Sequence, residues 1–151
     1  MAGGHTYEQG TTAACEKFDV RLNQWCQIAP MNKPRWYAAG AVHSDSVYVF
    51  GGQSDYYEYL DDVEQYNAVT DKWTYVVQAR FSVARSELAA ACIHDRIYLF
   101  GGFDEDGYDT ASSVSEYFDL TNMQIVPHES LQRPTYWAAA TSVVLNTSQV
   151  C

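Results

Sequence analysis

The sequence predicts an all-β fold made of antiparallel units that repeat along the chain, and three observations support this prediction. Two short apolar runs, Ser46–Gly52 (SVYVFGG) and Arg96–Gly102 (RIYLFGG), end in glycine pairs fifty residues apart. Aromatic residues recur at matching distances behind these pairs. No segment shows a convincing amphipathic helical pattern. A period of about 20–50 residues indicates a repeat architecture such as a solenoid or a propeller.

The repeat positions emerge when the segments are aligned on their glycine pairs, including a third pair near the N-terminus. An aromatic residue stands fourteen residues after the second glycine, and a tryptophan follows seven residues later. An arginine stands sixteen residues before the first glycine. The third segment keeps Phe118 after two extra loop residues and carries Ile125 in the tryptophan position. The predicted structural repeat residues are Gly3, Gly4, Gly51, Gly52, Gly101, Gly102, Phe18, Trp25, Tyr66, Trp73, Arg35 and Arg85.

The strands follow from the local pattern around these positions. Val47–Phe50 and Ile97–Phe100 are continuous apolar runs, which suit strands covered on both faces. Phe18–Trp25 has the composition of a strand end, a polar turn and a new strand, and Tyr66–Trp73 repeats it. Glycine lacks Cβ, so each pair permits unusual backbone angles and the close approach of a neighbouring sheet.

These coordinated positions together resemble the kelch repeat, and the resemblance covers essentially the whole chain. It implies a kelch-type β-propeller arc of four-stranded antiparallel blades, with strands A to D running outward from the axis. The rival WD-repeat propeller is disfavoured because its G-H…W-D signature is absent. By this resemblance the A strands are Tyr37–Val42, Glu87–Ile93 and Trp137–Leu145, the B strands are Ser46–Phe50 and Arg96–Phe100, the C strands lead into Phe18, Tyr66 and Phe118, and the D strands begin near Trp25, Trp73 and Ile125.

The repeat boundaries predict an incomplete ring. We expect residues 1–151 to form a partial kelch propeller, with repeats at approximately 1–34 (partial), 35–84, 85–134 and 135–151 (partial). This division gives two complete blades and two half blades, whereas propellers usually have about four to eight blades. We expect either a fragment of a longer kelch protein or an arc completed by a second copy or another chain. Self-association would cover the open blade faces.

Composition narrows the classes of partner. The formal net charge is −10, with 19 acidic residues against 9 lysines and arginines, which argues against binding a nucleic-acid backbone. No apolar stretch reaches the length of a membrane helix, and the N-terminus lacks the pattern of a signal peptide, so we expect a cytoplasmic protein. Reduced, packed thiols are expected there, although Cys15 and Cys26 fall on neighbouring predicted strands that would allow a disulfide.

The candidate partner-binding residues lie in the loops. In kelch propellers that bind proteins, contacts come mainly from the D–A and B–C loops, and the resemblance carries this role to equivalent positions. Tyr37 and Glu87 stand fourteen residues before the first glycine of a pair, and Trp137 is their equivalent by its offset of one hundred residues from Tyr37. The position after each pair holds His5, Gln53 and Phe103. Ordinary rim residues are the alternative reading of any one of them.

The two B–C loops are rich in acids and aromatics. Residues 53–62 contain four acids and three tyrosines, among them Tyr56 and Tyr57, and residues 103–112 contain four further acids, among them Asp104 and Asp106. Aromatics anchor contacts and carboxylates steer basic groups, so this composition favours a protein partner with a basic segment. A solvated acidic loop is the alternative.

No catalytic, metal or cofactor site is predicted. The four histidines lack ligand spacing, and the acidic run at Asp104 lacks the downstream part of a calcium-loop pattern. A nucleophile-elbow motif is also absent. The resemblance is greatest to the kelch-like family, in which BTB and BACK domains precede a propeller that recruits substrates for a cullin-RING ubiquitin ligase. The alternatives are an actin-binding or scaffold kelch protein and, less favoured, an enzyme resembling galactose oxidase or sugar epimerases.

Overall fold

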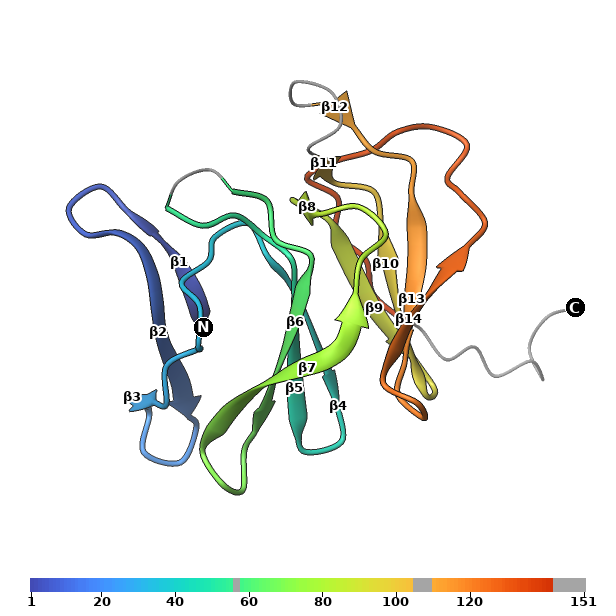
Figure 1. Cartoon of the computed structure of the whole chain (residues 1–151). Helices are drawn as coiled ribbons and strands as arrows, with labels where there is room; N and C mark the ends of the chain where they lie inside the picture. The colour runs from blue at the N-terminus through green and yellow to red at the C-terminus, as the bar shows by residue number, and fades with distance from the viewer. Residues whose placement is uncertain (56–57, 105–109, 143–151) are drawn as a thin grey trace, which may run out of the picture.

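The computed structural model describes residues 1–55, 58–104 and 110–142 of the chain. Antiparallel sheets stand side by side in chain order, like neighbouring blades of an arc (Figure 1). The described residues contain no α-helix, and therefore no helix that could cross a membrane. The predicted all-β arc of antiparallel blades is confirmed.

The first sheet contains three strands. β1 (Ala2–Thr6), β2 (Gly10–Asp19) and β3 (Gln24–Ile28) pair in that order. The sheet thus contains the B, C and D strands of a blade, as the position of the first glycine pair predicts. No strand of the described residues pairs with the free edge of β1.

The next two sheets each contain four strands in the predicted order. β4 (Ala39–His43), β5 (Ser46–Phe50), β6 (Asp62–Asn67) and β7 (Lys72–Arg80) form one of them. β9 (Ala89–Ile93), β10 (Arg96–Phe100), β13 (Ser115–Asp119) and β14 (Gln124–His128) form the other. The B strands have the predicted bounds. The inner strands β4 and β9 begin two residues later than predicted, which leaves Tyr37 and Glu87 in the preceding loops.

A smaller sheet lies at one end of the third blade. β8 (Arg85–Ser86), β11 (Phe103–Asp104) and β12 (Thr110–Ala111) pair in the order β12-β11-β8. In the second blade, isolated bridges join Trp36 to Gln53 and Gln53 to Tyr59 in the same arrangement. The residue after the second and third glycine pairs, Gln53 or Phe103, is therefore the centre of a short backbone ladder.

The third predicted inner strand, Trp137–Leu145, is not formed in its described part. Residues 137–142 have no strand structure, and residues 143–145 lie outside the described residues. The physical reason is the lack of a partner, because no described strand lies beside this segment to accept its backbone hydrogen bonds. The prediction of a strand over residues 137–142 was therefore wrong.

The core lies between the sheets, where side chains of one blade pack on the next. Between the second and third sheets, the ring of Phe118 lies 5.3 Å from that of Tyr48 and 5.7 Å from that of Phe50. Between the first and second, Trp73 Nε1 donates to Ala29 O at 2.9 Å. Because every blade packs on the preceding one in this way, the arc is held together by repeated interfaces.

The same repeat positions are exposed in the first blade. Tyr66 and Trp73 are 5% and 8% exposed because they pack against the first sheet, whereas Phe18 and Trp25 are 44% and 59% exposed. No described segment covers Phe18 and Trp25. The predicted aromatic positions therefore hold a blade interface only where a preceding blade is present.

The described cysteines are free thiols. Cys15 lies opposite Ile28, and Cys26 lies opposite Lys17, so the two sulfurs are out of register for a bridge between β2 and β3. Burial raises the pKa of the Cys15 thiol, which keeps it protonated and unreactive.

Candidate protein-binding face

The two ends of the sheets differ in their connections. One end carries tight turns, and the other carries the long B–C and D–A loops (Figure 1). We call the second end the loop face and define it by residues 5–9, 32–38, 51–55, 58–61, 82–88, 101–104, 110–114 and 129–137. The candidate contact residues that the structure describes belong to this end.

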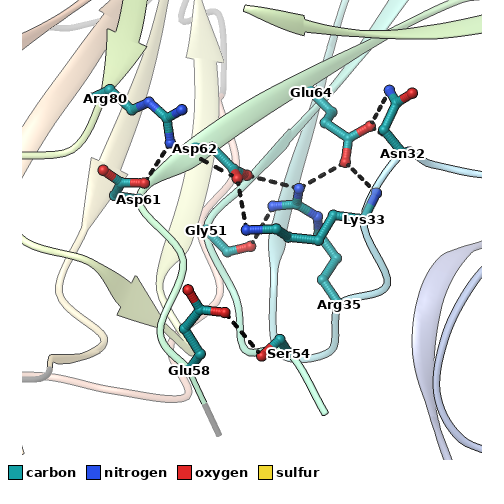
Figure 2. Close-up of polar contacts among 10 residues, drawn as sticks. All are labelled: Asn32, Lys33, Arg35, Gly51, Ser54, Glu58, Asp61, Asp62, Glu64 and Arg80. Carbon is teal, nitrogen blue, oxygen red and sulfur yellow. Dashed lines mark hydrogen bonds and ion pairs between the residues drawn. The ribbon is translucent and has the colours of Figure 1, made fainter. Parts of the chain in front are cut away.

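A buried arginine fixes the loop that leads into the second blade. Arg35 is 0% exposed, and its guanidinium donates to Asp62 and Glu64 at 2.7 Å each and to the Gly51 carbonyl at 2.8 Å. Figure 2 shows this guanidinium between the two carboxylates. The Glu64 carboxylate also accepts from the backbone amides of Asn32 and Lys33. The loop is therefore tied to strand β6 by charge-assisted hydrogen bonds.

The third blade repeats this arrangement. Arg85 is fully buried and donates to the Gly101 and Val114 carbonyls and to Glu116. Glu116 accepts in turn from the Ser82 amide at 3.0 Å. Burial lowers the pKa of Arg85, and the charge of Glu116 opposes this effect. The two arginines therefore set the geometry of successive loops on the loop face.

The three candidate residues of the D–A loops are brought together. The Glu87 amide donates to the Tyr37 carbonyl at 2.8 Å, and the Trp137 amide donates to the Glu87 carbonyl at 3.2 Å. All three have left-handed backbones, with φ of 53°, 57° and 51°. Such angles are uncommon for residues other than glycine, and they cluster at functional sites. Three successive repeats thus place equivalent residues side by side in one conformation.

Aromatic rings form two ladders on this face. In the first ladder, His5 lies 4.8 Å from Trp36, which stacks on Tyr37 at 4.2 Å. In the second, Phe103 lies 4.2 Å from Tyr136, and Trp137 lies 5.1 Å from Tyr136. Each ladder joins a residue after one glycine pair to two residues of the following repeat.

The ladders leave large aromatic rings accessible. Tyr37 is 45% exposed and Trp137 is 70% exposed. Tyr37 is stacked on Trp36, and Trp137 meets Tyr136 edge to face. Exposed tyrosine and tryptophan held by neighbouring rings provide rigid contact area with little loss of side-chain entropy on binding.

The repeat between the two ladders is polar instead. Gln53 and Ser86 stand where the neighbouring repeats have the aromatic pairs His5 with Trp36 and Phe103 with Tyr136. Gln53 is 8% exposed and Ser86 is 0% exposed, so Gln53 offers little surface to a partner. Glu87 follows Ser86 and is half-buried.

The acidic B–C loop of the second blade is largely engaged within the chain. Asp62 is buried in its ion pair with Arg35, and Asp61 lies 2.6 Å from the Arg80 guanidinium. Asp55 accepts from the Thr11 amide at 2.7 Å. Of the acidic and tyrosine candidates, Asp104 is half-buried on β11, while Tyr56, Tyr57 and Asp106 lie outside the described residues.

Two sets of residues on the loop face were not predicted from the sequence. Glu64 and Glu116 hold the arginines, and each stands two residues before the repeat aromatic, as Glu16 also does. That recurrence was a usable signal. Trp36 and Tyr136 build the ladders, and their place next to Tyr37 and Trp137 was the only signal for them.

The described residues contain no group of three or more histidine, cysteine, aspartate or glutamate side chains that could hold a metal ion. The His43 ring lies 3.5 Å from Asp95 at the turn end.

The blades and their loop face define an arc of a kelch-repeat propeller. The whole chain, residues 1–151, matches the family model of the KLHDC2/KLHL20/DRC7 Kelch-repeats domain, and the chain belongs to this family. It is 31% identical over 122 residues to Kelch-like protein 26 of Danio rerio, covering 78% of this chain and 20% of that protein. It is 30% identical over 130 residues to Kelch-like protein 36 of Mus musculus, covering 81% and 21%.

A third relative, Kelch-like protein 38 of Mus musculus, is 32% identical over 107 residues, covering 69% of this chain and 18% of that protein. The chain therefore spans about a fifth of the length of the curated relatives it matches. The relatives support a kelch protein-interaction module.

Proposed function

We propose that the loop face is the surface by which this module binds a partner protein. The observation that carries the proposal is the convergence of Tyr37, Glu87 and Trp137 from three successive repeats, with two aromatic ladders on either side of Glu87. Exposed aromatic anchors in a fixed frame are the usual centres of binding energy.

A basic segment in the partner suits the charge of the module. The net charge of −10 and the acids Glu87 and Asp104 on the loop face would speed the approach of a positively charged surface. The supply of free carboxylates is smaller than composition alone indicates, because Asp61 and Asp62 are paired within the chain.

By its resemblance to the kelch-like family, the partner would be a substrate that a cullin-RING ubiquitin ligase modifies in the cytoplasm. In that family the BTB domain docks the ligase, and this chain would provide part of the substrate-binding half. A longer form of the protein that carries those domains is expected to co-purify with a cullin.

Affinity capture with an immobilised chain tests the loop face. The Tyr37→Ala/Trp137→Ala double variant should lose proteins that the unsubstituted chain retains, because it removes both exposed anchors. Val69 is 80% exposed in the turn between β6 and β7, so Val69→Ala is the matched control and should retain them. Equal retention by the double variant and the control would rule out the loop face as the binding surface.

A further inference from the structure

Two side-chain oxygens on consecutive residues of the middle repeat have no hydrogen-bond partner among the described residues. Ser86 Oγ and Glu87 Oε2 are inaccessible to solvent, and neither has a partner among the described residues. A buried acceptor without a donor typically costs about 1–3 kcal/mol. Native structures rarely keep such groups without a reason, and a ligand that supplies the missing donor is one such reason.

The contrast with Glu64 and Glu116 shows what the Glu87 carboxylate lacks. Those two carboxylates accept from a buried arginine and from backbone amides of the adjacent loop. The Glu87 carboxylate has the same chemistry, but its Oε2 accepts from no arginine within the part of the chain that the structure describes. Glu87 therefore offers the acceptor of an arginine–glutamate pair, an interaction that the chain forms twice internally, and lacks the arginine.

The flanking residues suit a planar cation. Tyr37 and Trp137 are joined to Glu87 through their backbones and share its left-handed conformation. Aromatic faces attract cations, and a guanidinium also stacks on them while its N–H groups donate to a carboxylate. An ammonium group lacks the stacking plane and the forked geometry.

We propose that Glu87, between Tyr37 and Trp137, binds an arginine side chain of the partner protein. On binding, the half-buried Glu87 side chain turns so that its carboxylate accepts from the guanidinium, which stacks against one or both exposed rings. This inference rests on the proposed function of the loop face and makes Glu87, rather than the acidic B–C loops, the residue that selects a basic partner.

The test measures binding of a defined peptide to the ¹⁵N-labelled chain by NMR. The probe is an acetylated, amidated pentapeptide with one central arginine between glycine and serine residues, and its counterpart has the neutral isostere citrulline. The arginine peptide should shift the amide signals of Tyr37, Glu87 and Trp137 in a saturable way. The citrulline peptide should bind at least about tenfold more weakly, because it lacks the charge.

The variant Glu87→Gln keeps the side-chain shape and removes its charge. It should weaken the arginine peptide by about tenfold and leave the citrulline peptide unchanged. Asp45→Asn removes the same charge from an exposed residue in the turn between β4 and β5 and should change neither affinity. The dispersion of the amide signals reports whether each variant is folded.

The outcomes separate this inference from the function of the face. Equal binding of both peptides at Tyr37 and Trp137 would overturn the arginine preference while leaving a peptide-binding loop face. Binding of the arginine peptide that Glu87→Gln does not weaken would overturn the role of Glu87. Absence of any shift would also overturn the inference, whereas loss of captured proteins in Tyr37→Ala/Trp137→Ala would still support the loop face.

Discussion

At the scale of single residues, two buried arginines connect the framework to the loop face. The buried guanidinium groups of Arg35 and Arg85 donate to carboxylates and carbonyls instead of to water. The same carboxylates accept from backbone amides of the adjoining loop. A buried ion pair is weak evidence for net stability, but removing one partner leaves an uncompensated charge. The arginines therefore matter most for the geometry of the loops that end at Tyr37 and Glu87.

Replacing Arg35 by methionine should destabilise the chain strongly. Asp62 and Glu64 are 4% and 0% exposed and would lose their shared guanidinium, which predicts a loss of about 3–5 kcal/mol. Arg80→Met is the control, because the Arg80–Asp61 pair is exposed and should contribute about 0–1 kcal/mol. Thermal unfolding measures both. Equal shifts in Tm would show that the Arg35 network does not hold the blade.

The arginine positions could be predicted from the sequence, but their partners required the structure. Arg35 and Arg85 recur sixteen residues before a glycine, whereas the role of Glu64 depends on which strand lies beside the loop. The ring contacts of the aromatic ladders also required the structure, because the rings of His5 and Trp36 meet only when two blades pack together.

At the scale of elements, the glycine pairs allow the backbones of neighbouring repeats to approach closely. A Cβ on Gly51 would lie 2.4 Å from the Arg85 carbonyl, and one on Gly52 would lie 2.6 Å from the Trp36 carbonyl. The Gly52 amide donates to the Arg85 carbonyl at 2.9 Å, so the close approach itself is a hydrogen-bonded contact between neighbouring repeats. Both glycines also have positive φ, at 57° and 97°.

The pairs offer a matched test of this crowding. Gly4 is the equivalent of Gly52 and also has a positive φ, but a Cβ there would meet nothing within 4 Å. Gly52→Ala should therefore lower the free energy of unfolding by about 1–3 kcal/mol more than Gly4→Ala, since only Gly52 adds a backbone clash to the strain. Equal losses in urea unfolding would mean that φ alone makes glycine necessary.

The strands themselves were largely predictable, and the exception has a physical cause. Continuous apolar runs before a glycine pair located β5 and β10 to the residue. The alanine-rich pattern at Trp137–Ala140 resembles that of β4 and β9, yet residues 137–142 form no strand. A strand needs a neighbour for its hydrogen bonds, and sequence pattern alone does not report whether that neighbour is present.

At the scale of the whole molecule, the arc is a series of similar interfaces whose outermost positions are uncovered. Trp73 is 8% exposed and donates to the Ala29 carbonyl across the first interface, while its equivalent Trp25 is 59% exposed. Equivalent residues therefore contribute differently to the free energy of unfolding, and the repeat pattern in the sequence does not reveal this difference.

Tryptophan substitutions measure how much each equivalent residue contributes to stability. Trp73→Ala should cost about 3–5 kcal/mol, because it leaves a cavity between the first two blades. Trp25→Ala should cost less than about 1.5 kcal/mol, since it removes mainly the edge contact with Phe18. Chemical denaturation compares the two. A Trp25→Ala loss as large as that of Trp73→Ala would indicate that the face of the first blade is covered in solution.

The proposed function places partner binding on the loop face, and the dissociation constant of a captured partner tests this most directly. Calorimetric titration should show binding by the unsubstituted chain and by Val69→Ala with affinities within about twofold of each other. Tyr37→Ala/Trp137→Ala should weaken binding at least about a hundredfold, because two exposed anchors are removed together. An unchanged dissociation constant for the folded double variant would contradict the loop face as the binding surface.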